Sequence, residues 1–122
     1  MIPVNPDRKT VLITGGNKGI GFAIAKKFAT EGFNIVISGR DEKALKNANT
    51  QLAEYSDVPS NYFICDVTNQ NDIKSMIDQI TNVTTIDVLI NNAGIHETKS
   101  FMDYELKDFK RVIETKIGRA HV

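Results

Sequence analysis

Short apolar runs alternate with amphipathic stretches along the 122 residues of the chain. The apolar runs are rich in β-branched residues and end at glycine or polar positions, which is typical of buried strands. Four strands are predicted, at residues 10–14, 33–38, 62–65 and 86–90. Between them, apolar side chains recur every three or four positions, which is typical of helices. Helices are predicted at residues 18–30, at 41–52 with Asp41 as the N-cap, at 69–82 and near 105–114.

The order of these elements predicts an α/β fold. Strands that alternate with helices form a parallel sheet with right-handed crossovers. The predicted strands are almost continuously apolar, as expected when helices cover both faces of a sheet. Because the sequence holds no repeat, low-complexity tract or linker-like segment, we expect a single domain.

Composition and charge exclude several classes of protein. Fifteen basic and fifteen acidic residues cancel, so neither a nucleic-acid partner nor a membrane partner is expected. The single cysteine, Cys65, excludes an internal disulfide framework. His96 has no cysteine or second histidine near it, so no metal site is predicted. With no signal-peptide pattern and no run long enough to span a membrane, a cytoplasmic location is expected.

A glycine-rich turn lies between the first predicted strand and the first predicted helix. It reads Thr-Gly-Gly-Asn-Lys-Gly-Ile-Gly over residues 14–21. Glycine lets a phosphate approach the backbone, and the N-terminus of the next helix offers unpaired N–H groups and a partial positive charge. This pattern predicts a pyrophosphate cradle, although a tight connection that binds nothing would carry the same glycines. The predicted contacts are Gly15, Asn17, Lys18, Gly19, Ile20 and Gly21.

Three motifs in this order resemble the short-chain dehydrogenase/reductase superfamily, in particular its 3-oxoacyl-carrier-protein-reductase-like group. They are Thr14-Gly15-x-x-x-Gly19-x-Gly21, Asp66-Val67 and Asn91-Asn92-Ala93-Gly94, and the resemblance covers residues 8–115. It implies a Rossmann-type doubly wound parallel sheet, truncated after the fourth strand and the start of the following helices. Residues 1–115 would be the N-terminal, dinucleotide-binding half of this single domain.

The resemblance also implies a function for the parent protein and further contacts with its cofactor. The parent would be an oxidoreductase, a homodimer or homotetramer, that transfers hydride between a nicotinamide cofactor and a small-molecule carbonyl or alcohol substrate. Asp66 and Val67 would contact the adenine, and Asn92, Ala93 and Gly94 would lie beside a ribose. The asparagine side chains of this last motif would also tie neighbouring strands together.

The end of the second predicted strand bears on the choice of cofactor. Sites that select NAD place a carboxylate on the ribose 2′-hydroxyl at this point. Here Gly39 fills that place and Arg40 follows, and a guanidinium can grip a 2′-phosphate. Lys18 would add a second cation. NADP(H) is therefore the expected cofactor and NAD(H) is possible, unless Arg40 is only a solvated surface charge.

The sequence contains no Tyr-x-x-x-Lys pair, which the chemistry of this superfamily requires for proton transfer. The residues four positions after the three tyrosines are Pro59, Asp66 and Asp108. No catalytic residue is therefore predicted, and we expect the chain itself to be inactive. The alternative is a non-catalytic short form that binds NADP(H) or a partner. A flavodoxin-like or regulatory α/β protein would fit the alternation of elements but not the three motifs together.

The last seven residues fit the family pattern poorly. Lys116 stands where the family has asparagine, and the next six residues can be written as ATC GGA AGA GCA CAC GTC, a widely used sequencing adapter. We therefore expect residues 116–122 to be a non-native tail translated from adapter sequence. The fourth strand would then be an exposed edge of the sheet, which favours aggregation.

Overall fold

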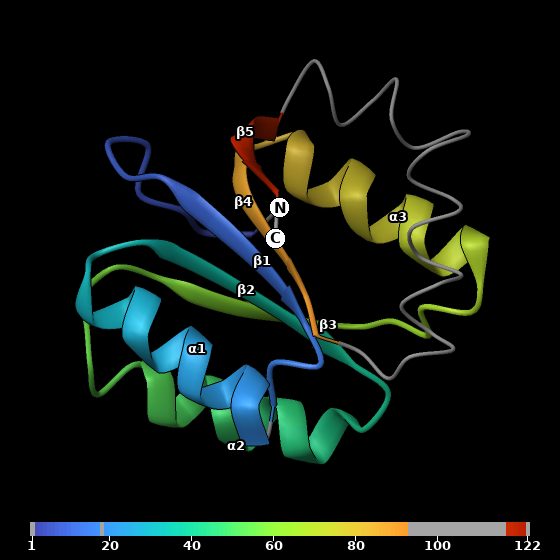
Figure 1. Ribbon diagram of the computed structural model, residues 1–122, viewed down its shortest axis with the longest axis horizontal. Coiled ribbons are helices and arrows are strands. Elements are labelled where there is room, and N and C mark those ends of the chain that lie inside the picture. The colour runs from blue at the N-terminus through green and yellow to red at the C-terminus, as the bar shows by residue number, and fades with distance from the viewer. Residues whose placement is uncertain (1, 18, 93–116, 122) are drawn as a thin grey trace.

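The computed structural model describes residues 2–17, 19–92 and 117–121 (Figure 1). Their elements are, in chain order, β1 (Thr10–Thr14), α1 (Gly19–Thr30), β2 (Asn34–Gly39), α2 (Glu42–Leu52), β3 (Ser60–Ile64), α3 (Gln70–Thr81), β4 (Ile86–Asn91) and β5 (Ile117–His121). The alternation predicted over residues 10–91 is confirmed, and no end of an element differs from the prediction by more than two residues. The helix predicted near 105–114 lies outside the described residues.

All strands of the described sheet are parallel, in the order β3-β2-β1-β4-β5. Helices α1 and α2 cover one face and α3 covers the other (Figure 1). The carboxyl ends of the strands therefore meet at one edge, where Thr14 of β1 lies opposite Ser38 of β2 and Asn91 of β4. This doubly wound arrangement confirms the predicted fold class.

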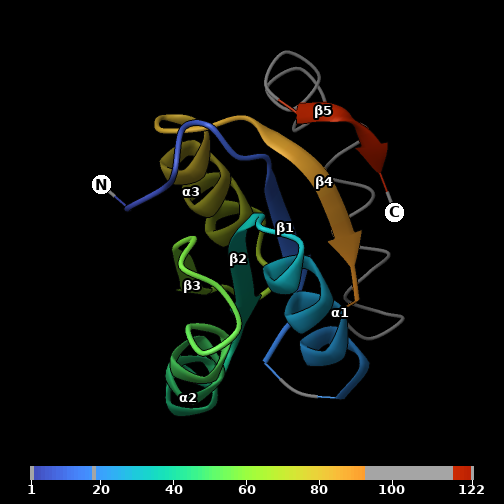
Figure 2. The ribbon, with the colours of Figure 1, turned by 90° about the vertical axis from the view of Figure 1, so that its left-hand side faces the viewer.

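Strand β5 lies beyond β4 at the outer side of the sheet (Figure 2). It pairs in parallel with β4, with Ile86 opposite Ile117 and a shift of register between Ile86 and Val88. The expectation that the fourth strand is an exposed edge is therefore wrong, because backbone pairing covers that side of β4.

Neighbouring residues of β1 divide the apolar core into two layers. Val11 and Ile13 point toward α1 and α2, while Leu12 between them points toward α3. All three are fully buried, which explains why an unbroken apolar run forms the central strand. The α3 layer is built mainly on Ile73, Met76, Ile77 and Ile80, the positions that the helical periodicity predicts.

Side-chain caps fix where two of the helices begin. Asp41, the predicted cap, accepts a hydrogen bond from the N–H of Ala44 at 3.2 Å, ahead of α2. Asn69 accepts bonds from the N–H groups of Asn71 and Asp72, ahead of α3. These bonds satisfy N–H groups that have no partner within the helix.

Asn34, at the start of β2, fastens the N-terminal segment to the sheet. Its Nδ2 donates to the carbonyl oxygens of Asn5 and Arg8 at 2.9 and 3.0 Å, and to Oγ1 of Thr10 at 3.2 Å. Its Oδ1 accepts a bond of 2.7 Å from the N–H of Asn5. This fully buried amide thus has partners for both of its polar atoms.

Candidate functional site

The glycine turn connects the carboxyl end of β1 to the N-terminus of α1. Gly15 and Gly19 have φ angles of 68° and 59°, which glycine adopts without strain. The N–H of Gly15 donates to the carbonyl of Ser38 at 2.8 Å, so the turn starts against the end of β2. A Cβ built on Gly19 would meet no atom within 4 Å, and the neighbouring Ile20 is 73% exposed. The start of α1 is therefore open to a ligand.

Gly21, in the same turn, is required for close packing and not for a positive φ. A Cβ at this position would overlap the carbonyl oxygen of Gly15 and lie 2.5 Å from Nδ2 of Asn92. Gly21 therefore lets the first turn of α1 pack directly against the backbone that leaves β1. Glycine is required here for close packing, as in the standard dinucleotide fingerprint.

Hydrogen bonds join the end of β4 to the glycine turn. The hydroxyl of Thr14 donates to Oδ1 of Asn91 at 3.0 Å and accepts from the N–H of Asn92 at 2.9 Å. Nδ2 of Asn92 donates to the carbonyl of Gly15 at 3.3 Å. The prediction that these asparagines tie neighbouring strands together is confirmed. Ala93 and Gly94 lie outside the described residues.

The end of β2 meets the glycine turn at Asn17. A Cβ on Gly39 would lie 2.8 Å from Oδ1 of Asn17, so the carboxamide covers the Cα of that glycine. Arg40 follows and is exposed. Lys18, the second predicted cation, lies outside the described residues.

Asp66 lies just past β3 and is held by its own turn. Its Oδ1 accepts bonds from the hydroxyl of Thr68 at 2.6 Å and from the N–H of Thr68 at 2.9 Å. These bonds, that of the hydroxyl first, lower the pKa of Asp66, and the charge of Arg40 adds to the effect. Asp66 is therefore a carboxylate at neutral pH, near the Arg40 cation.

Two neighbours of Asp66 point into the core. The side chain of Val67 packs in the α3 layer, so a contact between Val67 and a ligand would have to use its backbone. Cys65 lies just past β3 and is 1% exposed. Burial raises the pKa of its thiol to about 12, with smaller contributions from Asp72 and Asp66. The thiol therefore stays protonated, and Cys65 serves as a small apolar residue of the α3 layer.

Two residues at this edge were not predicted to hold the site together. They are Thr14, which bridges β1 and β4, and Thr68, which fixes the Asp66 carboxylate. The Asp-x-Thr spacing of residues 66–68 is a turn signal that could have indicated the second contact. For the first contact, the resemblance implied that the asparagines would link to a neighbouring strand but not that Thr14 would be the partner, because the partner depends on the pairing of strands far apart in the chain.

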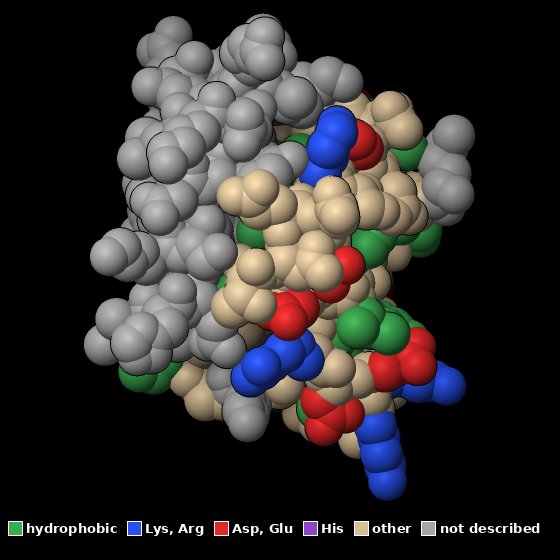
Figure 3. Space-filling view, turned by 90° about the vertical axis from the view of Figure 1, so that its right-hand side faces the viewer, with side chains coloured by type: hydrophobic (Ala, Val, Ile, Leu, Met, Phe, Trp, Pro, Cys, Tyr) green, Lys and Arg blue, Asp and Glu red, His purple; other side chains and the backbone are tan. Residues whose placement is uncertain are grey.

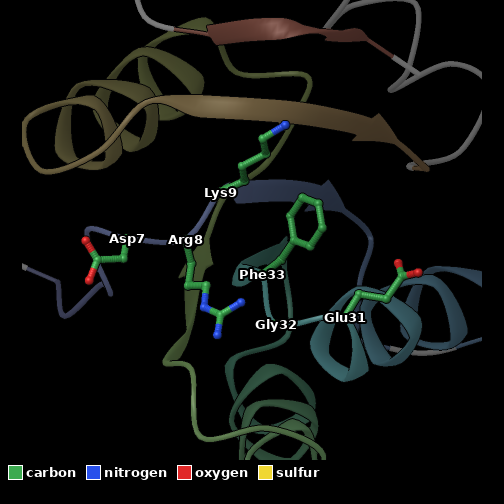
Figure 4. A pocket seen from close by; sticks show the side chains of 6 residues that line it. All are labelled: Asp7, Arg8, Lys9, Glu31, Gly32 and Phe33. Carbon is green, nitrogen blue, oxygen red and sulfur yellow. The ribbon is translucent and has the colours of Figure 1, made fainter.

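A cavity of about 220 Å³ lies at the opposite, amino edge of the sheet (Figure 4). Arg8, which precedes β1, points toward Gly32, and a Cβ there would lie 3.2 Å from the guanidinium. The cavity is lined by Asp7, Arg8, Lys9, Glu31, Gly32 and Phe33. It is therefore separate from the edge that gathers the predicted site residues.

Other kinds of site would appear as a patch of one charge, a cluster of metal-binding side chains or a helix that spans a membrane. On the face shown in Figure 3, acidic and basic side chains lie interspersed rather than in one patch of a single sign. No three or more His, Cys, Asp or Glu side chains of the described residues gather into a group able to hold a metal ion. Within the same residues, no helix is both long enough and apolar enough to cross a bilayer.

Known proteins share this sequence pattern and this fold. A sequence model of the short chain dehydrogenase family matches residues 9–118. The chain belongs to this family. It is 34% identical over 111 residues to the 3-oxoacyl-acyl-carrier-protein reductase FabG of Chlamydia muridarum, a match that covers 90% of this chain and 45% of the relative. It is 39% identical over 101 residues to human short-chain dehydrogenase/reductase 3, covering 79% of this chain and 32% of the relative.

Solved structures of this short-chain dehydrogenase family share the fold. The F189W actinorhodin polyketide ketoreductase with NADPH aligns with a TM-score of 0.70 and 30% identity, over 75% of this chain and 35% of that one. NAD⁺-bound xylitol dehydrogenase aligns with a TM-score of 0.77 over 92% of this chain and 51% of that one, at 24% identity. The chain spans about half the length, or less, of the relatives that it matches. The predicted family is confirmed, and the roles predicted for individual site residues stay predictions.

Proposed function

We propose that this short-chain dehydrogenase chain binds NADP(H) at the carboxyl edge of its sheet. The observation that carries the proposal is the pairing of an open glycine turn with a β2 strand that ends in Gly39 and Arg40. The turn offers a helix N-terminus for a pyrophosphate. The end of β2 offers a guanidinium in place of the carboxylate that selects NAD(H).

The residues present fit such a ligand. Gly19 leaves open space above the backbone, as close approach of a pyrophosphate requires. Arg40, together with Lys18, would pair with the 2′-phosphate, and the Asp66 carboxylate would accept a bond from the adenine amino group. The backbone of Val67 and the segment from Asn92 to Gly94 would complete the wall. When bound, the nicotinamide ring supplies the hydride.

Two solved structures that are 27–30% identical to this chain contain the proposed cofactor. The actinorhodin polyketide ketoreductase structure contains NADPH. A metagenomic short-chain oxidoreductase, 27% identical to this chain, was solved in complex with NADP. NAD⁺-bound xylitol dehydrogenase shares the fold as well, so our preference for NADP(H) over NAD(H) rests on the Gly39-Arg40 end of β2.

The proposal for the whole protein is a carbonyl reductase or alcohol dehydrogenase that acts on a small molecule, as a homodimer or homotetramer. The 122 residues contain no Tyr-x-x-x-Lys pair to move the proton. The chain by itself should therefore bind the dinucleotide without oxidising it. A fall in NADPH absorbance when the pure chain meets a carbonyl substrate would contradict this part of the proposal.

The test of the cofactor site is a charge reversal at the end of β2. Arg40→Glu should weaken NADP⁺ binding by about ten- to a hundredfold, because hydrogen bonds between charged groups are lost and repulsion replaces them. Binding of NAD⁺ should change much less. Lys46→Glu is the matched control, since it makes the same charge change at an exposed position of α2. Isothermal titration of each protein with both cofactors measures the effect, and unchanged NADP⁺ affinity in Arg40→Glu would refute the proposal.

A further inference from the structure

The backbone conformation of Gly39 does not require glycine. Among the described glycines, those with positive φ are Gly15, Gly19 and Gly32, so the backbone of Gly39 is open to any L-residue. What limits this position is space. A Cβ there would lie 2.8 Å from Oδ1 of Asn17, 3.6 Å from its Cγ, and 3.4 Å from Cδ2 of Leu45.

The two neighbours of Gly39 differ in their freedom to move. Leu45 is fully buried in the layer beneath α2 and cannot retreat without opening the core. Asn17 presents the end of a short side chain, which can rotate. A side chain at position 39 must therefore displace the Asn17 carboxamide, and only one of the two groups can occupy this space.

We propose that Asn17 is a specificity-determining residue, because its carboxamide occupies the space that an acidic side chain at position 39 would need. The inference rests on the proposed function, because the end of β2 is where a dinucleotide site reads the ribose 2′-position. A carboxylate at position 39 would accept a bond from a 2′-hydroxyl and repel a 2′-phosphate. While the carboxamide of Asn17 covers Gly39, no carboxylate can be placed there.

The competition between positions 17 and 39 for one space predicts how substitutions at both positions change the affinity for the two cofactors. Gly39→Asp alone should lose affinity for NADP⁺ without gaining much for NAD⁺, because the new side chain competes with Asn17 for one space. Asn17→Ala vacates that space. The double substitution should then seat the carboxylate and bind NAD⁺.

The experiment is a double-substitution cycle in the full 122-residue chain. NADP⁺, NAD⁺, adenosine 2′-phosphate and adenosine 5′-phosphate are titrated into the unsubstituted chain, Asn17→Ala, Gly39→Asp and the double variant. We expect Gly39→Asp to gain less than about threefold in NAD⁺ affinity, and the double variant to bind NAD⁺ at least about tenfold more tightly than Gly39→Asp. An equal gain with and without Asn17 would overturn the inference.

A second cycle measures the shared space without any ligand. Gly39→Ala should raise the urea midpoint of unfolding when position 17 is alanine, because the backbone of Gly39 suits any L-residue. With Asn17 present the gain should be smaller or absent, because the new Cβ must first displace the carboxamide. If the unsubstituted chain binds neither dinucleotide, the proposed function fails, and this second cycle still decides whether the two positions compete. Additive effects on the midpoint would show that they do not, and would overturn the inference.

Discussion

Replacing Gly21 by alanine tests whether close packing fixes the glycine turn. At an open helix position alanine is about 1 kcal/mol more stabilising than glycine. At Gly21 the new Cβ overlaps the Gly15 carbonyl oxygen and stands 2.5 Å from Nδ2 of Asn92. Moving the turn or the helix costs about 1–3 kcal/mol, and the Asn92–Gly15 hydrogen bond is worth about 1 kcal/mol more. After the helix gain is subtracted, Gly21→Ala should lower the free energy of unfolding by about 1–3 kcal/mol.

Urea unfolding followed by far-UV circular dichroism measures this loss, since the chain contains no tryptophan. With a slope of about 2 kcal/mol per molar urea, the midpoint should fall by about 1 M. Ala23→Gly, at an exposed position of α1, reports helix propensity alone, about 1 kcal/mol. Gly19→Ala is a second control, for backbone strain without crowding. Its Cβ would meet no atom within 4 Å, but alanine at a φ of 59° costs about 1–2 kcal/mol. A Gly21→Ala protein as stable as the unsubstituted chain would refute the packing argument.

Three other groups give predictions of their own. Thr68→Val removes the hydroxyl that lowers the pKa of Asp66, so NMR titration should show this pKa rise, whereas Thr68→Ser should leave it in place; no rise in Thr68→Val would contradict the assignment. The thiol of Cys65 titrates at 9.0 ordinarily and at about 12 in the folded chain, so the unfolded chain loses this proton first and stability should fall as the pH rises from 9 to 12. Cys65→Ala should lack the part of this fall in stability that the thiol causes. Identical pH profiles of stability for Cys65→Ala and the unsubstituted chain would contradict the prediction. Asn34→Ala should cost about 1–3 kcal/mol because it removes four hydrogen bonds made by a fully buried amide, whereas Asn61→Ala, which loses one exposed bond to Pro3, should cost about 0.5 kcal/mol or less; equal losses would contradict the role given to Asn34.

The hydrophobic pattern predicts the fold well wherever burial decides the structure. Strand β1 is buried at every position, and its residues contact both layers of the core. The start of β3 is less predictable, since Ser60 and Asn61 are polar and join the sheet through backbone pairing with Ile35 and Val36. Edge strands of this kind carry a weak apolar signal because one side of the strand faces solvent.

Strand β5 is even harder to predict from the hydrophobic pattern than β3. Residues 117–121 contain glycine, arginine and histidine and show no apolar run. Their backbone pairs with β4 all the same, because a paired backbone satisfies the hydrogen-bonding groups of both strands whatever the side chains are. The non-native origin expected for residues 116–122 stays a prediction. Sequencing the gene through codon 122 tests it, and a stop codon directly after Val122 in genomic DNA would refute it.

The site shows where sequence reasoning stops. Motifs at the ends of parallel strands predict which residues share an edge, because the carboxyl ends of those strands meet there. The motifs do not predict which side chains touch. The contact between Asn17 and Gly39 depends on the path of the turn, and the bridge from Thr14 to Asn91 depends on strand register. Both are properties of the folded backbone.

Most residues of this edge serve the fold and the proposed site at once, and this determines how their variants should be interpreted. Gly21 and Asn92 hold the turn against β4, so changing either should lower stability and affinity together. Arg40 is exposed at the end of β2, outside both core layers, and the charge it presents to Asp66 acts at the exposed surface, so Arg40→Glu should lower affinity and change the urea midpoint much less than Gly21→Ala does. A loss of affinity therefore identifies a contact with the ligand only where stability is retained. Arg40 meets that condition, which makes it a sharper probe of the cofactor than any glycine of the turn.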